Sequence, residues 1–297
     1  MPSADLAAYV VRLRASRSLT ITNHMGRAIQ QLALHLVRQV DSTLSESIHG
    51  VSQIKPYAVS GLLQPGSTRA VRGRILSGDC AWVRVAGLRT DVVAALDQSM
   101  PEPEAEVEID HIPWKVESVF DNNSEHPWAG RTSYGELIQR YHAAALPDSV
   151  QLEFASPTAF SSADLNIPLP DPLRVFDSLH QQWSALIPSA AFALPESLME
   201  FVRHFVPLSE YSAHTEVLTL KTPEVGFCAK QVKFTIKQRV SVGKSVRKNK
   251  PEYARTLETL NDQRNDLARA VALLAAFAFY CGIGIKTTTG MGMVRPV

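Results

Sequence analysis

The sequence has 297 residues, a formal net charge of +1, and 45% hydrophobic against 20% charged residues. This balance is typical of a globular protein and excludes an intrinsically disordered or fibrous chain. The length is sufficient for two modest domains, each of which can bury its own core. Because the net charge is close to zero, any surface that binds nucleic acid has to be a local basic patch.

No segment of the sequence predicts a membrane span or a secretion signal. A helix that crosses a bilayer needs about 18 or more apolar residues in a row. The most apolar run, residues 268–280, is shorter and contains Arg269. The N-terminal residues Met1 to Asp5 lack the basic start and apolar stretch of a signal peptide. We therefore expect a soluble, cytoplasmic protein.

The cysteines and histidines form no metal-binding motif. Cys80, Cys228 and Cys281 are far apart and form no CxxC pair, so neither structural zinc nor a disulfide framework is expected. The sequence contains no HxxxH or HExxH pair. We predict that the protein binds no metal and needs no cofactor. We interpret several scattered histidines as surface or core residues: His111, His126, His142, His180, His204 and His214.

The first half of the sequence predicts strands and helices in the order of a split βαβ unit. Apolar residues recur at helical spacing over residues 25–40, for example at Ile29, Leu32 and Leu36. We expect strands over residues 6–13, 57–63, 70–76 and 81–85, one or two strands within 106–120, and helices over 25–40, 44–49, 90–98 and 133–145.

The second half repeats this order after a boundary near Pro147, which divides the chain into domains 1–146 and 147–297. Residues 167–172 are too rich in proline for a regular helix or strand. The predicted fold is therefore α+β, with two tandem ferredoxin-like (RRM-like) domains and a C-terminal glycine-rich loop. We expect strands over residues 151–154, 213–220 and 229–238, helices over 172–186 and 196–205, one long helix over 253–280, and a last strand through Met293 and Val294.

A glycine-rich loop, Gly282 to Met293, follows the long apolar helix. Glycine lets the backbone come close to a ligand, and such loops expose N–H groups that can bind phosphate. The loop is not a P-loop, because it lacks GxxxxGK[ST] and follows a helix. A tight connection from helix to strand would explain the glycines equally well. The predicted RNA-binding residues of the loop are Gly282, Gly284, Lys286, Thr287, Gly290 and Gly292.

This loop, at the end of a doubled ferredoxin-like pattern, resembles the RAMP superfamily of CRISPR-associated proteins. Within it, the chain is most similar to the repeat-processing endoribonucleases, the sixth Cas family. Other stretches resemble family motifs in the same order along the chain: Ser47 to Gly50 with Lys55 to Ser60, Phe154 to Phe160, and Val225 to Phe227 ahead of Val232 to Phe234.

The sequence also departs from the family pattern. Ile285 stands where many members carry arginine, and Cys228-Ala229 stands where a second glycine is common. A charged insertion, Arg239 to Arg255, precedes the long helix, and the first helix lacks a tyrosine that some members use.

The resemblance implies a metal-independent endoribonuclease that cleaves CRISPR precursor RNA within the repeat and releases guide RNAs. In this reaction the ribose 2′-hydroxyl attacks its own phosphate and leaves a 2′,3′-cyclic phosphate and a 5′-hydroxyl. The implied partner is CRISPR repeat RNA, and other Cas effector subunits are compatible with the family. No membrane partner is expected, and the choice between monomer and homodimer stays open.

Such a reaction needs a base, an acid and a cation beside the phosphate. Histidine suits proton transfer because its ordinary pKa is about 6.5. The resemblance carries the catalytic roles onto His49 and Lys55, with His35 as a third candidate. His24 ranks last, because a role in capping the first helix beside Asn23 is a sufficient explanation.

Clusters of basic residues are candidates for a groove that binds phosphates. Arg72 and Arg74, near Arg69, are expected in one hairpin, and Lys237 and Arg239 follow Lys230 and Lys233 along a strand. Arg247 and Lys248 belong to a third run with Lys244 and Lys250, for which a solvated loop is an equally good interpretation.

Two other functions compete with the endoribonuclease. A non-catalytic RNA-binding subunit of a CRISPR effector complex would keep the loop but would not need His49 with Lys55. A phosphoesterase on a doubled fold would need two HxT or HxS motifs, and only the dipeptide His214-Thr215 resembles one.

Overall fold

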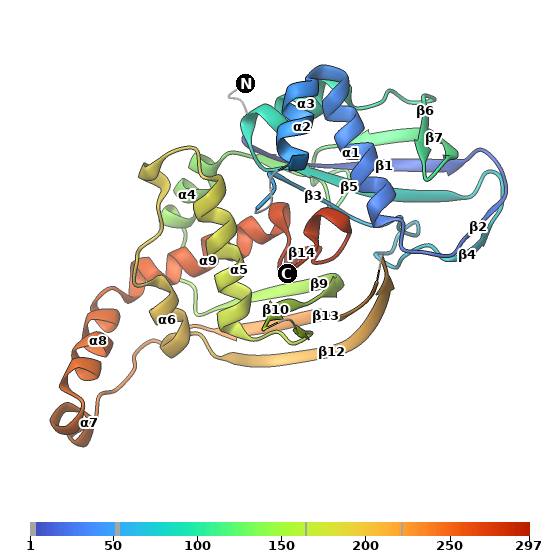
Figure 1. Cartoon of the computed structure of the whole chain (residues 1–297). Coiled ribbons are helices and arrows are strands. Elements are labelled where there is room, and N and C mark those ends of the chain that lie inside the picture. Colours follow the sequence, from blue (N-terminus) through green and yellow to red (C-terminus); the bar gives the residue numbers. More distant parts are fainter. Residues whose placement is uncertain (1–3, 51–53, 164, 221) are drawn as a thin grey trace.

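Two antiparallel sheets, one from each half of the chain, form the framework of the computed structural model (Figure 1). The structure describes residues 4–50, 54–163, 165–220 and 222–297. The strands of the N-terminal sheet are β1 (Leu6–Ala15), β3 (Tyr57–Val59), β5 (Cys80–Gly87), β6 (Glu106–Ile109), β7 (Ile112–Phe120) and β8 (Gly130–Thr132). Their order in the sheet is β3-β5-β1-β7-β6, and β8 also pairs with β1.

Helices α1 (Gly26–Val40), α2 (Ser42–Gly50) and α3 (Thr90–Ser99) cover one face of the N-terminal sheet. Helix α4 (Tyr134–Ala143) follows β8, and its Tyr134 and Leu137 pack on the opposite side, in the cluster that contains α9. The apolar side chains of α1 and α3 pack on β1 and β5 in one cluster that includes Ile29, Leu36 and Val92. A separate small ribbon pairs β2 (Leu19–Ile21) with β4 (Gly73–Ile75).

The C-terminal sheet has the order β12-β13-β9-β14 and carries its own helices. Its strands are β9 (Ser149–Thr158), β12 (Leu208–Thr219), β13 (Pro223–Thr235) and β14 (Val294–Pro296), and a small hairpin pairs β10 (Phe160–Ser162) with β11 (Leu165–Ile167). The helices are α5 (Pro172–Leu186), α6 (Leu198–Phe205), α7 (Lys244–Asn249), α8 (Pro251–Asp262) and α9 (Arg264–Cys281), with short 3-10 turns η1 (Ala190–Phe192) and η2 (Thr287–Thr289).

Both halves have the ferredoxin-like order of elements, which confirms the predicted α+β fold. The first half runs β1-α1-β3-β5-α3-β7, and these strands lie in the order β7-β1-β5-β3. The second half runs β9, α5 and α6, β12, β13, α9, β14, and its strands lie in the equivalent order β14-β9-β13-β12.

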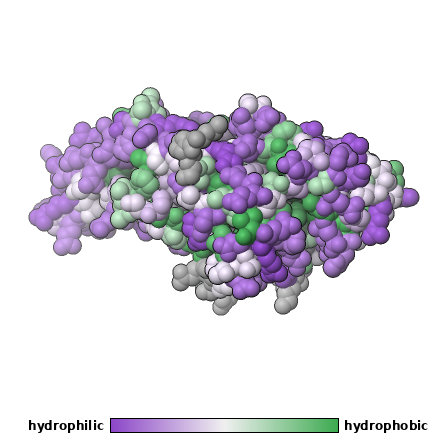
Figure 2. All heavy atoms as spheres, turned by 90° about the horizontal axis from the view of Figure 1, so that it is seen from above, coloured by the Kyte–Doolittle hydropathy of each residue, from purple (hydrophilic) through white to green (hydrophobic). Residues whose placement is uncertain are grey.

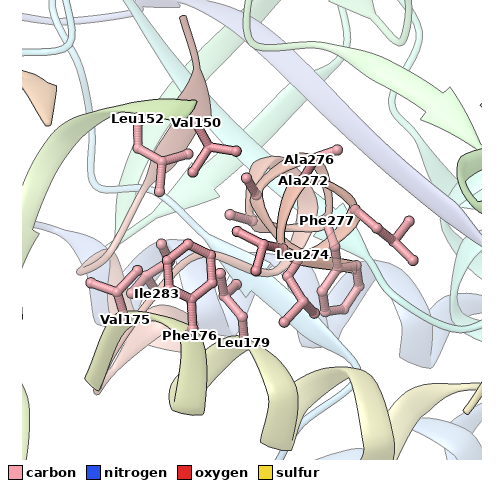
Figure 3. Packing of buried hydrophobic residues seen from close by; sticks show 14 of the residues in the cluster. Val150, Leu152, Val175, Phe176, Leu179, Ala272, Leu274, Ala276, Phe277 and Ile283 are labelled. Atoms are coloured by element: carbon pink, nitrogen blue, oxygen red, sulfur yellow. The ribbon is translucent and has the colours of Figure 1, made fainter. Parts of the chain in front are cut away.

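The two halves share a core that is centred on α9. Successive side chains of a strand point to opposite faces. Accordingly, Ala7 and Tyr9 of β1 join the core of the first half, whereas Leu6 and Ala8 join a core with the second half. Helix α9 runs between the sheets (Figure 1), and Figure 3 shows its Leu274 and Phe277 beside side chains of α5. The predicted division at residues 146 and 147 falls between α4 and β9 and stays a prediction.

A buried arginine also joins the two halves. Arg84 on β5 donates hydrogen bonds to the backbone oxygens of Trp128, over 2.9 Å, and of Phe279 on α9. Its guanidinium group also lies over the Phe279 ring, 4.8 Å from the centroid. Burial lowers the pKa of Arg84 to about 10. These contacts satisfy a cation that would otherwise be costly to bury.

The predicted long helix over residues 253–280 is wrong in one respect, since the structure divides it into α8 and α9 at Gln263. The Asn261 side chain donates to the backbone oxygen of Val240 and accepts from the backbone N–H of the same residue. Ser197 also donates a hydrogen bond to the Gln263 side chain. These contacts with distant segments fix the end of α8. The helix also ends at Asn261 and Asp262, and such short polar residues favour helix ends.

Other differences concern short strands and the basic run. The predicted strands over 57–63 and 70–76 shorten to β3 and β4, and β4 pairs with β2 outside the main sheet. Strands β2, β8, β10 and β11 were not predicted. The basic run at residues 244–250, for which a solvated loop was one of two interpretations, contains the short helix α7.

Within the described residues, no helix is long and apolar enough to cross a membrane. The face of the molecule shown in Figure 2 is mostly hydrophilic, and hydrophobic atoms show there only in small patches.

Candidate functional site

The glycine-rich loop packs tightly against its own half of the protein. A Cβ atom on Gly284 would lie 2.4 Å from the Ala159 backbone oxygen, and its φ is +84°. The backbone N–H of Gly284 donates to the Ser178 hydroxyl of α5 over 2.9 Å, and the Gln182 side chain donates to the Gly282 oxygen. Much of the glycine pattern therefore follows from packing inside the protein, as the alternative interpretation of the loop predicted.

One part of the loop nevertheless offers free donors. Lys286 has a left-handed backbone, with φ 58° and ψ 31°, immediately before the 3-10 turn η2. Within the described part of the chain, the backbone N–H groups of Lys286, Thr287 and Thr288 have no hydrogen-bond acceptor. Consecutive N–H groups after such a left-handed residue form a concave site for anions.

The residues that carry these N–H groups line a pocket between the two halves, which we call the loop pocket. Its volume is about 380 Å³, and its walls include Lys55 from the first half, Arg174 and Ser178 from α5, and residues 284–288. Arg174 lies in the first turn of α5 and donates a hydrogen bond to the Ser162 hydroxyl over 3.3 Å. The pocket thus combines the cationic side chains of Lys55 and Arg174 with backbone donors, which suit an anionic ligand, and it also contains one carboxylate, that of Asp177.

The structure brings close together His49 and Lys55, the two residues to which the resemblance assigned catalytic roles. Lys55 Nζ donates a hydrogen bond to the backbone oxygen of His49 over 2.8 Å. His49 lies in the last turn of α2, and its side chain is exposed. Residues 51–53, which connect them, lie outside the described residues. His49 does not line the loop pocket itself; its backbone oxygen is bound by Lys55, which does, and its exposed imidazole is accessible to a polynucleotide.

His35 is placed elsewhere. It is exposed on α1 and lines a different pocket, beside Gln39 and the β6–β7 hairpin. Its Nε2 lies 3.3 Å from the Gln39 side-chain nitrogen. The structure therefore does not bring His35 into the loop pocket, and its catalytic role stays a prediction.

His24 is a buried residue and does not cap α1. The N-cap of α1 is Met25, whose backbone N–H donates to the Asn23 side chain. His24 is only 3% exposed, and a Cβ atom on Gly61 or Gly290 would lie within 2.6 Å of its ring. Burial, helped by the charge of Arg72, lowers the pKa of His24 to about 4. His24 thus packs between the glycine-rich loop and the first half as a neutral ring.

Lys286 is already paired inside the protein. Its ammonium group forms an ion pair with Glu224 at the start of β13. Glu224 is only 5% exposed and also accepts hydrogen bonds from Thr222 and Asn166. The hydrogen bond from Lys286 holds the pKa of Glu224 below its usual value. If Lys286 contacts RNA as predicted, its ammonium group has to bind a phosphate in addition to Glu224 or in place of it.

A second hollow lies between the two sheets, and we call it the inter-sheet cleft. It has a volume of about 740 Å³, and Arg69, Arg72 and Lys230 line it together with His24. Arg72 reaches across the cleft and donates to the Val217 oxygen of β12 over 3.3 Å. Of the two arginines expected in one hairpin, Arg72 lines the cleft, whereas Arg74 is exposed on β4.

The other predicted basic residues lie at the opposite end of the C-terminal sheet. Lys237 and Arg239 follow the end of β13, which pairs with Ser149 at the start of β9. The glycine-rich loop contacts the other end of β9, about 30 Å away at 3.3 Å per strand residue. Arg247 and Lys248 lie on α7, which projects from the body in Figure 1, and Arg247 pairs with Glu258 over 3.0 Å.

Sequence reasoning missed two features. Arg174 follows a proline-rich segment without any motif of its own, and only the fold places it beside Lys55. His214, Glu216 and Cys228 form a cluster on β12 and β13, with donor atoms within 4.8 Å of one another. The register of the two strands, which the sequence does not encode as a motif, brings them together.

Comparison with protein families identifies the second half of the chain. Residues 152–294, which include most of β9, all of α9 and the glycine-rich loop, match the model of the family described as CRISPR-associated endoribonuclease Cas6. This part of the chain belongs to the Cas6 family. The match confirms the family that the sequence motifs indicated.

Solved structures extend the likeness to the whole chain. A Cas6 solved as a product complex has a TM-score of 0.72 and 23% identity, and the match covers 98% of this chain and 99% of that chain. Thermus thermophilus Cas6 has a TM-score of 0.68 and 20% identity, with 100% of both chains covered. The product of a Cas6-related gene from Pyrococcus furiosus has a TM-score of 0.57 and 10% identity, with 98% of both chains covered. The whole chain therefore has the Cas6 fold, and no curated protein matches its sequence.

Proposed function

We propose that this protein is an endoribonuclease that cleaves CRISPR precursor RNA within the repeat and releases guide RNAs. The observation that carries the proposal is that one pocket is lined by Lys55, Arg174 and residues 286–288, whose backbone N–H groups have no acceptor among the described residues, and that Lys55 also binds the backbone oxygen of His49. Membership of the second half in the Cas6 family supports the same function. Repeat RNA is the proposed partner, because one of the similar Cas6 structures is described as a substrate mimic complex.

The proposed chemistry uses the substrate's own nucleophile. The 2′-hydroxyl oxygen attacks the adjacent phosphorus, the bond from phosphorus to the 5′ oxygen breaks, and the products are a 2′,3′-cyclic phosphate and a 5′-hydroxyl. His49 transfers a proton as general acid or base. Lys55 and the loop N–H groups stabilise the charge that develops on the phosphate oxygens. This route needs no metal ion, because the protein supplies the positive charge.

A cleavage assay tests the proposal. Purified protein is incubated in EDTA with a labelled repeat RNA from the CRISPR array of the same genome, and with an RNA that has a 2′-deoxy nucleotide before the scissile phosphate. We expect one cut in the first RNA, a cyclic phosphate on the upstream product, and no cut in the second RNA. Cleavage that requires a divalent metal, or that persists in the 2′-deoxy RNA, would contradict the proposed chemistry.

A second candidate function is that of a non-catalytic RNA-binding subunit of a CRISPR effector complex. The observation in its favour is that neither histidine predicted for catalysis lines the loop pocket, since His35 lines another pocket and His49 is linked to the loop pocket only through Lys55. Such a subunit would bind the repeat RNA and leave it intact in the same assay.

A further inference from the structure

A cluster of metal-ligand side chains lies on the wall of the inter-sheet cleft. His214 and Glu216 are two residues apart on β12, so their side chains share one face of the sheet. Cys228 is the direct partner of His214 on β13. The three side chains therefore point to the same side by the geometry of the hairpin alone.

The donor atoms are already close to the spacing of a metal site. His214 Nε2 lies 3.0 Å from Glu216 Oε1, and the ligand atoms of all three residues lie within 4.8 Å of one another. Tetrahedral Zn²⁺ binds nitrogen and oxygen at about 2.0–2.2 Å and sulfur at about 2.3 Å, so neighbouring ligand atoms lie about 3.3–3.7 Å apart. Small rotations of the exposed His214 and Glu216 side chains would close the remaining distance.

Burial and access also suit a metal. Cys228 forms the floor of the cluster and is 7% exposed, whereas His214 and Glu216 are exposed to the cleft. An ion can therefore enter from solvent and reach a sulfur that the strands hold in place. Cys228 and its two companions all line the inter-sheet cleft.

The donor set selects the class of metal. One imidazole nitrogen, one carboxylate oxygen and one thiolate sulfur suit Zn²⁺ or Co²⁺, whereas Mg²⁺ and Ca²⁺ prefer oxygen ligands only. A thiolate and a carboxylate balance the two positive charges of the ion. Three protein ligands leave a fourth position open, which is the arrangement of zinc sites that bind water or an exogenous ligand.

We propose that His214, Glu216 and Cys228 form a binding site for a Zn²⁺-class metal ion whose open position faces the inter-sheet cleft. Arg72 and Lys230 line the same cleft, so the ligand that completes the coordination would be hydroxide or another small anion. The site is separate from the loop pocket, whose lining residues include none of the three.

Cobalt spectroscopy tests the site directly. Untagged, metal-stripped full-length protein is titrated with Co²⁺, and absorption is followed for thiolate-to-cobalt charge transfer and for the visible bands of tetrahedral cobalt. We expect both features to saturate at one ion per chain and to disappear when Zn²⁺ is added. Absence of the charge-transfer band in the wild-type protein would overturn the proposal.

Variants assign the ligands. Cys228→Ser should lose the charge-transfer band, whereas Cys80→Ser, a matched control at a partly exposed thiol outside the cleft, should keep it. The variants His214→Ala and Glu216→Gln change exposed side chains, so both proteins should fold normally. Their affinity for Co²⁺ should nevertheless fall by about 10-fold or more. A band that survives in Cys228→Ser, or wild-type affinity in both His214→Ala and Glu216→Gln, would rule out this site.

Discussion

Lys55 Nζ donates a hydrogen bond to the backbone oxygen of His49 over 2.8 Å. The contact holds an ammonium group at the end of α2, where Lys55 also lines the loop pocket. A cation and an imidazole are thereby anchored to one short segment of the first half. The backbone N–H groups that we propose to bind the phosphate come from the second half, so the proposed active site exists only where the two halves meet.

His49→Ala should lower the single-turnover cleavage rate of repeat RNA by about 10²- to 10⁴-fold, because positioned proton transfer contributes that much. Lys55→Ala should lower it by about 10²- to 10³-fold through the loss of one charge-stabilising donor. RNA affinity and thermal stability should change little for His49→Ala, since the side chain is exposed. His142→Ala, at an exposed histidine on α4, is the control. A His49→Ala variant with the wild-type rate would remove His49 from the mechanism.

His24 should make the folded state sensitive to acid. Its pKa is about 4 in the folded protein and about 6.5 in an unfolded chain, so between these values only the unfolded chain takes up the proton. Stability should therefore fall as the pH drops from about 6.5 to about 4, by up to about 3 kcal/mol, and level off below. Urea unfolding of wild type and His24→Gln across this window measures the effect.

The comparison with His24→Gln isolates this group from the other histidines. The difference in unfolding free energy between the two proteins should shrink as the pH falls from 6.5 to 4. A difference that stays constant over the window would mean that His24 titrates normally in the folded state.

Gly290→Ala should destabilise the junction between the loop and the first half. The new Cβ would lie 2.6 Å from His24 Cε1 and 2.9 Å from the Gly61 nitrogen, at a φ of +96°. The backbone strain alone costs about 1–3 kcal/mol. The melting temperature should fall clearly, whereas Gly243→Ala, with nothing within 4 Å of its new Cβ, should leave it nearly unchanged. Equal melting temperatures for the two variants would show that the loop relaxes without cost.

The variant Lys286→Met should show whether this lysine stabilises the loop through its ion pair with Glu224 or binds RNA. Removal of the ammonium group leaves the buried Glu224 carboxylate with only its neutral partners, so we expect a loss of about 1–3 kcal/mol, between the values for exposed and buried pairs. The double variant Lys286→Met with Glu224→Gln should recover much of that loss. Lower RNA affinity in Lys286→Met at unchanged stability would instead favour a direct phosphate contact.

The exposed cations of α7 can be tested by the salt dependence of binding. Replacement of Lys244, Arg247 and Lys248 with alanine should weaken binding of a long precursor RNA. It should also reduce the slope of log K against log salt by about 0.7 for each phosphate that the variant no longer neutralises. Lys115→Ala on β7 controls for the removal of an exposed cation elsewhere. An unchanged slope in the triple variant would identify α7 as a solvated helix.

The sequence was informative wherever local signals decided the structure. Helix α5 begins at Pro172 and ends at Leu186 as predicted, because Asp171 caps its first turn and Pro172 suits the first helical position. The proximity of His49 and Lys55 also followed from their short separation along the chain.

Long-range contacts account for what the sequence could not predict. The break between α8 and α9 depends on Asn261 meeting Val240, and the neutralisation of Lys286 depends on Glu224, 62 residues away. Arg174 enters the loop pocket only because α5 packs beside the loop. Such pairings follow from the topology and register of the sheets, which residue patterns do not determine.

Helix α9 is apolar on nearly all sides, since both sheets and α5 enclose it. A hinge movement that separated the two halves would expose this helix to water, at a high free-energy cost. A closure of the loop pocket by movement of one half against the other is therefore unfavourable. For the proposed substrate, binding would then depend on how readily the RNA strand itself bends into a preformed pocket, so RNA with stiff or strongly stacked bases at the cut site should be a poor substrate.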